Sequence, residues 1–381
     1  MKLDVLTLRD RDAWTRTIDH CAPYDFYHLP GYHALAEEAS EGTAHLFVGT
    51  DGGHTIALPL LLRDVQGHGP ADGAGWRDAT SVYGYPGPLC SPLEVPEGIR
   101  REFQAALVRE LHELRVVTVF SRLHPLFPQR ELLAGLGEFA VSRTVSIDLT
   151  LPPDVQRSRF RMSDRTRINR LRREGLICTR DSDGSYLEDF LRIYHETMRR
   201  VRAAERYFFP RTYFEDLQRA LGSRLHLFVC LHEGRAICAG LFVACHGILQ
   251  YHLGGTLDAA LPSAPMKLLL DEVRLWGTDQ GLSVLHLGGG TTSDPDDPLL
   301  HFKKGFSDRT HEFATWRWVV NPDVYQRLCS EKDRRDEEHQ LRPTNPSFFP
   351  AYRAPTASRT ALDPASGTAE ALTVTTPGDR P

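Results

Sequence analysis

The sequence predicts a mixed α/β fold, built as two tandem copies of one unit with mixed sheets and followed by a disordered C-terminal tail. Three observations support this prediction. The 381 residues are enough for two domains that each bury a core. Apolar residues make up 41% of the chain and charged residues 25%, as in globular proteins. The segment at 45–62 recurs in altered form at 226–243.

The repeat joins two apolar hairpins that lie 181 residues apart. Upstream of each hairpin, the similar segments 29–39 and 209–221 both read as an aromatic-rich helix, so two copies of one unit explain the match better than chance does. Seven positions of the first hairpin are identical in the second: His45, Leu46, Phe47, Val48, Gly53, Ile56 and Leu60.

Each copy can be divided into elements from its apolar runs and turns. Strands are marked by apolar runs between Gly-containing turns, and helices by apolar residues at helical spacing. Pro262 and Pro265 are expected at the start of a helix, where proline is tolerated. The first copy is predicted to hold strands 45–50, 54–63 and 78–83, helix 97–114 and strand 115–120, and the second copy strands 226–231, 236–245 and 248–255, a helix ending near residue 280 and strand 282–290.

Strand, strand, strand, helix, strand is the core order of the GNAT acyltransferase fold, a mixed sheet that splays open where an acyl donor enters. We therefore predict an N-terminal domain over 1–150 and a C-terminal domain over 151–325. From 340 to 381, Pro and Thr recur without apolar periodicity, which predicts a disordered tail.

Composition excludes several classes of protein. No apolar stretch is long enough to span a bilayer, and the first residues lack a signal-peptide core, so we expect a cytoplasmic protein. The seven cysteines include no CxxC pair, and no HExxH motif occurs among the 17 histidines, so we expect no metal site. The net charge of −5 means that an anionic partner must be met by a local patch.

Such a patch lies between the two copies. Residues 151–180 hold nine arginines and three acidic residues, a local balance of +6. Because arginine suits bidentate phosphate contacts and the local acids are too few to neutralise the cluster, we predict that it binds a phosphate backbone. The arginines in question are Arg157, Arg159, Arg161, Arg165, Arg167, Arg170, Arg172 and Arg173.

Several motifs, in this order and spacing, resemble the Fem family of aminoacyl-tRNA-dependent transferases over about residues 20–320. They are DATSVYGYPGP (78–88), the run with Arg165, Ile168, Arg170 and Gly175, YHETMRR (194–200), RYFFPRTYF (206–214), QYHLGGT (250–256), and LHLGGG followed by DPLLHFKKGF (285–290, 297–306). The chain lacks the long helical hairpin of some wall-building members, and its QYHLGGT strand departs from the more usual Tyr-rich order.

The resemblance implies a tandem GNAT fold and transfer of an amino acid from charged tRNA to an amine acceptor, such as a peptidoglycan precursor or a peptide-like metabolite. No further cofactor is implied. An aminoacyl ester is already activated, so this reaction needs positioning and oxyanion stabilisation more than a protein nucleophile. Lys303 and Lys304 are the candidate catalytic cations, with Lys303 implied to approach the reacting carbonyl. His252 is a candidate base that keeps the amine neutral.

The candidate substrate-binding residues fall in four segments. The glycines before the lysines give backbone room for a ligand, and the resemblance implies that an Arg and a Tyr of the 206–214 segment contact the acceptor. The full set is Arg206, Tyr207, Arg211, Tyr213, Tyr251, Asp78, Tyr83, Gly288, Gly289 and Gly290.

An acyl-CoA or acyl-carrier donor is the main alternative. The stretch 256–270 has no Gly-rich pyrophosphate loop, and Pro262 and Pro265 remove two amide donors, which argues against ordinary CoA binding. A nucleotide-binding protein that uses LGGG as its phosphate loop is a weaker alternative, because no GK[ST] or GxGxxG context follows.

Overall fold

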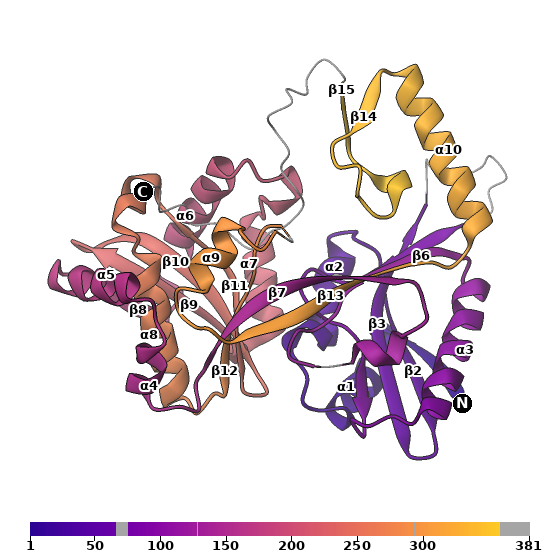
Figure 1. The fold of residues 1–381 in the computed structure, drawn as a ribbon, viewed down its shortest axis with the longest axis horizontal. Coiled ribbons are helices and arrows are strands. Elements are labelled where there is room, and N and C mark those ends of the chain that lie inside the picture. Colours follow the sequence, from indigo (N-terminus) through magenta and orange to yellow (C-terminus); the bar gives the residue numbers. More distant parts are fainter. Residues whose placement is uncertain (66–74, 128, 293, 359–381) are drawn as a thin grey trace. The chain divides into compact units, whose positions relative to one another are not determined.

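A computed structural model describes residues 1–65, 75–127, 129–292 and 294–358 (Figure 1). The chain forms two compact units. Within the described residues, unit 1 comprises 1–141 and 313–358, and unit 2 comprises 142–312. The boundaries therefore differ from the predicted 150 and 325: residues 142–150 belong to unit 2, and 313–325 belong to unit 1.

Unit 1 contains the first copy of the repeat and, in addition, the C-terminal elements. Its helices are α1 (Arg11–His20), α2 (Pro30–Glu38), α3 (Glu97–Glu113) and α10 (Pro322–Glu338), with short 3-10 turns η1 (Leu8–Asp10), η2 (Phe26–His28), η3 (Arg130–Leu133) and η7 (Ala351–Arg353). Its strands are β1 (Lys2–Thr7), β2 (Thr43–Asp51), β3 (His54–Asp64), β4 (Arg77–Thr80), β5 (Leu89–Ser91), β6 (Val116–Arg122), β14 (Leu341–Pro343), β15 (Thr356–Ser358) and most of β13 (Thr310–Val319).

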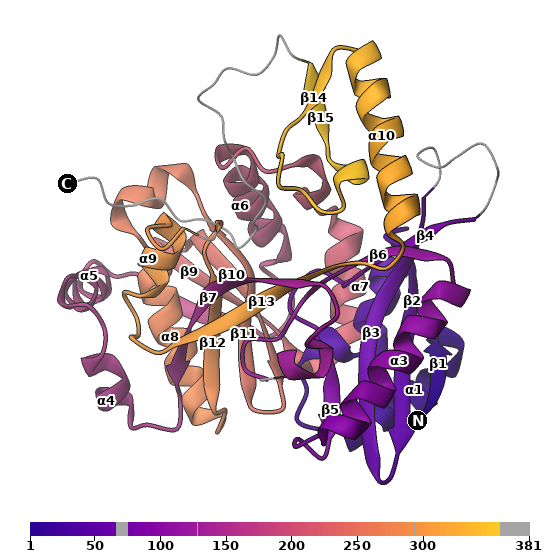
Figure 2. The same ribbon diagram turned by 45° about the vertical axis from the view of Figure 1, so that its right-hand side comes forward.

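Unit 2 contains the second copy, seen in Figure 2 from a second angle. Its helices are α4 (Pro153–Ser158), α5 (Met162–Arg173), α6 (Leu187–Arg200), α7 (Arg211–Leu221), α8 (Met266–Asp279) and α9 (Pro298–Lys303), with 3-10 turns η4 (Glu205–Tyr207), η5 (Gly222–Arg224) and η6 (Asp258–Ser263). Its strands are β8 (Ile177–Asp181), β9 (Leu225–His232), β10 (Arg235–Cys245), β11 (Ile248–Thr256), β12 (Val284–Gly289) and most of β7 (Glu138–Asp148).

The two units repeat one strand order, which confirms the tandem α/β prediction. Unit 1 has the order β1-β2-β3-β4-β6-β13 and unit 2 the order β8-β9-β10-β11-β12-β7. In each unit the fourth and fifth strands run parallel, and the last strand is antiparallel to the fifth. The last strand of each sheet comes from an unexpected place in the sequence. Strand β7 follows β6 of unit 1 in the chain but pairs with β12 of unit 2, and β13 follows the second copy but pairs with β6 of unit 1.

Each unit buries its own core between the sheet and its helices. In unit 1, Phe47, Phe103 and Trp316 lie at its centre, and in unit 2 Phe242 and Leu269 do. The helices α6 and α8 lie on opposite faces of the unit 2 sheet. A Cβ at Gly255 would meet the side chains of α6, whereas Tyr251 contacts Met266 of α8.

The C-terminal segment corrects the prediction of a tail that begins at residue 340. Residues 341–358 form β14, η7 and β15, and residues 359–381 lie outside the described residues. Tyr352 is fully buried, and its hydroxyl lies 3.0 Å from Thr118 Oγ1 and donates to Asp78 Oδ2 at 3.2 Å. The composition of 341–358 is poor in aliphatic residues, but buried Tyr352, the contacts of Arg353 with Asp78 and Asp64, and the stacking of Phe349 on Tyr325 hold the segment on unit 1.

We predict that Tyr352→Ala lowers the free energy of unfolding by about 3–5 kcal/mol, because it removes a buried aromatic side chain. Tyr352→Phe should cost about 1–3 kcal/mol, because it leaves Thr118 and Asp78 each with one partner fewer. Denaturant unfolding of the full chain measures both. If the unfolding free energies of both variants lie within about 0.5 kcal/mol of the wild-type value, the segment is not anchored through Tyr352.

We predict that buried histidines make unit 1 sensitive to acid. Burial lowers the pKa of His28 to about 3 and of His33 to about 4, below the ordinary 6.5. The folded state therefore binds fewer protons than the unfolded state below pH 6.5, so their contribution to stability is present above that pH and is lost as the pH falls towards these values. Between pH 6.5 and 5, each histidine should cost about 2 kcal/mol of unfolding free energy.

His33→Gln tests this prediction. The His33 Nε2 atom lies 3.0 Å from the Tyr27 carbonyl oxygen, and a glutamine amide can donate to the same acceptor. We expect denaturant unfolding at pH 7 and pH 5 to show a pH effect about 2 kcal/mol smaller in the variant. An unchanged pH effect would contradict the assignment of acid sensitivity to this histidine.

Candidate functional site

The parallel strands β11 and β12 part from each other inside the unit 2 sheet. They pair only at their first residues, where Ile248, Leu249 and Gln250 face Val284, Leu285 and His286. Beyond this point β11 continues to Thr256 beside β10 alone, and β12 continues to Gly289 beside β7. The splay predicted for an acyl-transfer site is therefore present in unit 2.

Both strands carry an irregularity where the splay begins. In β11, Tyr251 faces Phe242 and Leu253 faces Leu241, so His252 is an additional residue opposite β10. In β12 the register against β7 shifts between His286 and Gly288. Bulges of this kind bend a strand and redirect its side chains, and they are common beside active sites.

A buried amide and an imidazole join the two strands at the point of divergence. His286 Nδ1 lies 2.6 Å from Gln250 Oε1, and Gln250 Nε2 donates to the Tyr251 carbonyl at 2.9 Å. Sequence reasoning missed this pair. The available signal was that each strand places a polar residue, Gln250 or His286, at its third position directly after two aliphatic residues.

The Gly-rich end of β12 is held by Asp297, which also caps α9. Asp297 Oδ1 accepts from the backbone N–H groups of Leu299 and Leu300 at 2.9 and 3.0 Å. Its Oδ2 accepts from those of Thr291 and Thr292, both at 2.9 Å. Gly290 is required here, because a Cβ would lie 2.5 Å from Asp297 Oδ1. Gly288 has φ +76°, a conformation that favours glycine.

Lys303 is the last residue of α9, and its side chain is completely buried. Its Nζ donates to the Gly289 carbonyl oxygen at 2.6 Å, which ties α9 to the end of β12. Removal from water lowers the pKa of Lys303 well below the ordinary 10.5, and the nearby Asp297 carboxylate opposes that shift. Lys304 is only half-buried, so it is the more accessible of the two predicted cations.

The arginine-rich helix α5 begins against the turn that follows Lys303. The backbone N–H of Arg161 donates to the Gly305 carbonyl at 2.8 Å, and its guanidinium donates to the His301 carbonyl at 3.2 Å. A Cβ at Gly305 would lie 2.1 Å from Asp164 Oδ2, so only glycine allows this approach. The structure therefore brings two separately predicted groups together, the arginine cluster and the lysine pair.

Tertiary structure corrects the premise that the arginine cluster lacks acidic partners. Arg157 and Arg172 both bind the buried Asp271 of α8, and Arg172 also binds Glu272 at 2.7 Å. Arg170 binds Glu174 at 2.6 Å, one turn along α5. These three arginines serve at least in part to hold α5 in place.

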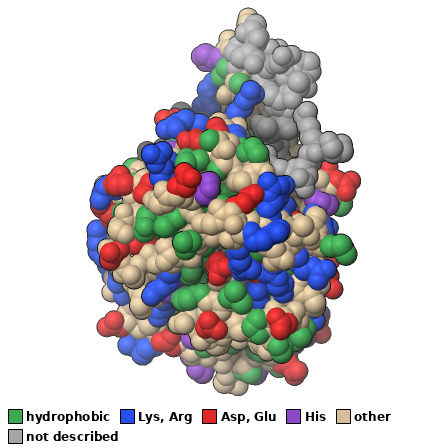
Figure 3. All heavy atoms as spheres, turned by 90° about the vertical axis from the view of Figure 1, so that its left-hand side faces the viewer, with side chains coloured by type: hydrophobic (Ala, Val, Ile, Leu, Met, Phe, Trp, Pro, Cys, Tyr) green, Lys and Arg blue, Asp and Glu red, His purple; other side chains and the backbone are tan. Residues whose placement is uncertain are grey.

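The remaining arginines of the cluster have no acidic partner within hydrogen-bond distance among the described residues. Arg159 and Arg173 are exposed, and Arg161, Arg165 and Arg167 are partly exposed. Figure 3 views the side of the molecule that carries α4 and α5 and shows Lys and Arg side chains gathered on it. A positively charged surface therefore persists after the internal ion pairs are formed.

His252 and Tyr251 both lie inside unit 2. His252 is 3% exposed, and burial lowers its pKa to about 3, so it is uncharged at neutral pH. Tyr251 is also 3% exposed; it stacks on Phe242 with ring centroids 5.1 Å apart, its hydroxyl lies 3.8 Å from the Met266 sulfur, and burial raises its pKa. Tyr251 is thus a core residue in this conformation.

The 206–214 segment surrounds an aromatic cluster between α6 and α7. Tyr213 stacks on Phe209 at 4.1 Å, and the Tyr207 carbonyl accepts from Tyr194 at 2.8 Å. Arg211 is exposed and forms ion pairs with Glu188 and Glu215. The side chain of Arg206 is outside what the structure describes.

The two candidates of the first copy lie in unit 1. Asp78 is fully buried, and both of its carboxylate oxygens are occupied by Arg63, Arg353 and Tyr352, so the structure gives it a role in holding protein side chains. Tyr83 is partly exposed, and its carbonyl accepts from Tyr32 at 3.0 Å.

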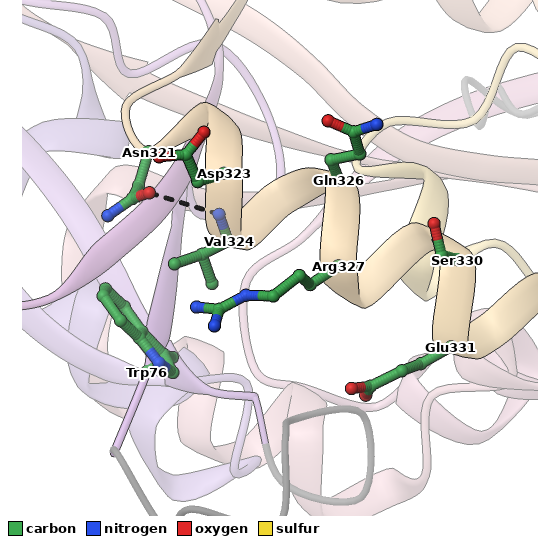
Figure 4. Close-up of a pocket in the computed structure, with 8 residues that line it drawn as sticks. All are labelled: Trp76, Asn321, Asp323, Val324, Gln326, Arg327, Ser330 and Glu331. Carbon is green, nitrogen blue, oxygen red and sulfur yellow. Dashed lines mark hydrogen bonds between the residues drawn. The ribbon is translucent and has the colours of Figure 1, made fainter.

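Unit 1 also carries a surface hollow of about 760 Å³ beside the start of α10 (Figure 4). Trp76, Val324 and Arg327 line it, and Asn321 caps the helix by accepting from the Val324 N–H at 3.2 Å. Among the described residues, no three His, Cys, Asp or Glu side chains are grouped as a metal site would require. No helix in the described ranges is long and apolar enough to cross a membrane.

Comparison with known proteins agrees with this geometry. Residues 158–304 match the acetyltransferase (GNAT) domain, a range that includes α5, the splayed strands and both lysines. No curated protein matches the chain in sequence.

Solved structures match most of the chain. FemX aligns with a TM-score of 0.61 and 14% identity, over 86% of this chain and 99% of that chain. A conserved protein of unknown function from Bacteroides thetaiotaomicron VPI-5482 aligns with a TM-score of 0.54 and 12% identity, over 84% of this chain and 99% of that chain. The C-terminal domain of a putative lysylphosphatidylglycerol synthetase from Agrobacterium fabrum aligns with a TM-score of 0.53 and 12% identity, over 86% of this chain and 96% of that chain. The predicted resemblance to Fem proteins is thus confirmed at the level of the fold.

Proposed function

Starting from a chain that has the FemX fold and carries a GNAT acyltransferase domain over 158–304, we propose that it transfers an amino acid from aminoacyl-tRNA to an amine acceptor. The supporting observation is the junction of α5 with the turn after α9. There, Arg161 joins a positively charged helix surface to the Lys303–Lys304 pair at the end of a splayed strand. A polyanionic donor whose reactive ester lies at its end suits this arrangement of charge.

The reaction needs little from the protein beyond positioning and charge. The acceptor amine attacks the ester carbonyl, a C–N bond forms, the C–O bond to the ribose breaks, and the ribose oxygen takes the proton that the amine loses. Negative charge develops on the carbonyl oxygen in the transition state. In this proposal that oxygen lies near Lys303 Nζ and the end of β12, and Lys304, Arg161 and Arg165 contact the terminal phosphates. A charged-tRNA donor places the reaction in the cytoplasm.

An acyl-CoA donor is the second candidate, because the matched domain is named for acetyl transfer. The segment before α8 argues against it. It forms the 3-10 turn η6 with Pro262 inside, and Pro265 precedes the first residue of the helix. The N–H groups of Lys267 and Leu268 donate to the carbonyls of Ala264 and Pro265 at 3.1 and 3.0 Å, so they do not form an open cradle for pyrophosphate.

Incubation with each aminoacyl-tRNA and a set of amine acceptors, with and without ribonuclease, tests the proposal. We expect a new amide, detected by mass, that ribonuclease abolishes. Calorimetric titration with acetyl-CoA should show no binding tighter than about millimolar, the level of a few stray contacts. Ribonuclease-insensitive product together with micromolar acetyl-CoA binding would overturn the tRNA donor and establish the acyl-CoA alternative.

A further inference from the structure

A second hollow of unit 1, of about 610 Å³, collects guanidinium groups from distant parts of the chain. Its lining includes Thr43 and His45 of β2, Arg63 and Asp64 of β3, Arg77 of β4, and Arg353 from the C-terminal segment. Neither the acyl-transfer proposal nor the motifs of the sequence use this hollow. It is made of described residues of unit 1 alone.

The buried Asp78 carboxylate orients two of these guanidinium groups. Asp78 Oδ1 accepts from Arg63 Nε at 2.6 Å, and Oδ2 accepts from Arg353 Nε. Asp78 is completely buried, whereas the side chains of Arg63 and Arg353 are 28% and 23% exposed. The carboxylate therefore lies behind the two arginines and holds each by its Nε, which leaves the outer edge of each guanidinium for other contacts.

Most N–H donors on the outer edges of Arg63 and Arg353 have no acceptor among the described residues. Arg353 Nη2 donates to the Asp64 carbonyl at 2.8 Å, but Arg353 Nη1 and both Nη atoms of Arg63 donate no hydrogen bond among the described residues. Arginine is charged at all physiological pH values, so two guanidinium groups around one carboxylate leave an excess of one positive charge. Arg77 adds a third guanidinium, 3.5 Å from the exposed Asp64 carboxylate.

Counted with Asp64 and Glu37 of the lining, the formal charges of the three guanidinium groups and the three carboxylates balance. What the hollow offers an anion is therefore its unused guanidinium donors and not an excess of positive charge. The Glu37 carboxylate keeps its charge, but one of its oxygens is occupied by the backbone, since it accepts from the Ala44 N–H at 3.0 Å. His45 is uncharged at neutral pH, because burial lowers its pKa below the ordinary 6.5. Gly42 leaves room for the Arg63 side chain: a Cβ there would lie 2.9 Å from Arg63 Cγ, and the φ of +143° at Gly42 is rarely adopted by other residues.

We propose that this hollow binds the oxyanion of a small phosphate-bearing molecule, with the free Nη groups of Arg63 and Arg353 as its donors. Planar guanidinium groups with paired N–H donors match the geometry of phosphate oxygens, and their fixed orientation lowers the entropy lost on binding. The site is independent of the acyl-transfer proposal, since no residue of unit 2 takes part. Asp78, predicted to bind substrate, positions the groups that bind the anion.

Calorimetric titration of the full chain with inorganic pyrophosphate, and in a second arm with a nucleoside diphosphate, tests the site. We expect saturable binding of pyrophosphate at one site that weakens as salt is added. If both probes bind with equal affinity, the site recognises the phosphates alone. If the nucleoside diphosphate binds at least tenfold more tightly, the ligand is a nucleotide. Either result supports the site. The absence of saturable binding of either probe overturns it.

Variants then locate the binding. Arg63→Lys keeps a cation beside Asp78 but loses the paired Nη donors, so it should weaken binding at least tenfold. Arg77→Gln removes a partly exposed cation that does not touch Asp78, and it should weaken binding about threefold to tenfold. Arg101→Gln is the matched control, because it removes one positive charge from an exposed position of α3. Thermal unfolding verifies that each variant is folded. Equal losses in the Arg77 and Arg101 variants would overturn the assignment.

Discussion

Replacing Lys303 with Met should lower the single-turnover rate of acyl transfer by about 100- to 1000-fold. A cation aimed at a developing oxyanion in a site without water is worth roughly 2.7–4 kcal/mol when removed. The Lys303 side chain meets the condition of desolvation, since it is fully buried at the end of β12. Met fills most of its volume, so the fold should persist, and affinity for the amine acceptor should change little.

Lys304→Met is the internal control. Lys304 is only half-buried and is proposed to contact a phosphate and not the reacting carbonyl, so at saturating aminoacyl-tRNA the variant should lose less than about threefold in single-turnover rate. If Lys304→Met lowers the rate more than Lys303→Met does, the catalytic cation is Lys304 and not Lys303. A loss of less than about threefold in both variants, under 1 kcal/mol, would exclude a catalytic role for the pair.

The pH dependence of the rate separates two roles of Lys303. Because burial lowers its pKa below 10.5, the ammonium is lost as the pH rises through that lowered pKa. If charge is what the reaction needs, the wild-type rate falls along this limb, and the limb is absent from Lys303→Met. A rate that instead rises through the same pKa would assign the neutral amine as the active form, a base rather than an oxyanion partner.

Replacing Arg165, Arg167 and Arg173 together with Gln should weaken binding of tRNA and flatten its dependence on salt. These three have no acidic partner within hydrogen-bond distance among the described residues, so they are available to phosphates. Each lost contact should reduce the slope of log K against log salt by about 0.7–0.9, so the triple variant should lose about 2–3. Filter binding of tRNA at several salt concentrations measures this slope.

A second triple variant controls for net charge. Arg199, Arg202 and Arg224 are exposed residues of the same unit outside the cluster, so their replacement with Gln removes equal charge elsewhere. We expect its salt slope to remain within about half a unit of the wild type, less than one lost phosphate contact. If both triple variants change the slope equally, tRNA binding is a property of net charge and not of α5.

The sequence determined the elements and their repetition. Apolar runs and turn residues placed β9, β10 and β11 within two residues of their observed ends, because local patterns decide where a strand begins and ends. The order of the elements and the repeat at 45–62 and 226–243 were sufficient for the tandem GNAT fold. The lysine pair and the arginine cluster were also visible, because both are contiguous in the chain.

Only the tertiary structure decided which unit each strand joins and which ion-pair partner each charged side chain has. Strands β7 and β13 each pair with the unit that follows them in sequence and not with the unit whose strands precede them, which no local pattern encodes. Asp271 and Glu272 neutralise arginines about 100 residues away, and Tyr352 and Arg353 anchor a segment of tail-like composition on Asp78. The burial of Lys303 on the Gly289 carbonyl is likewise a contact between separate elements. Burial and ion pairing depend on neighbours in space, and these neighbours are set by packing.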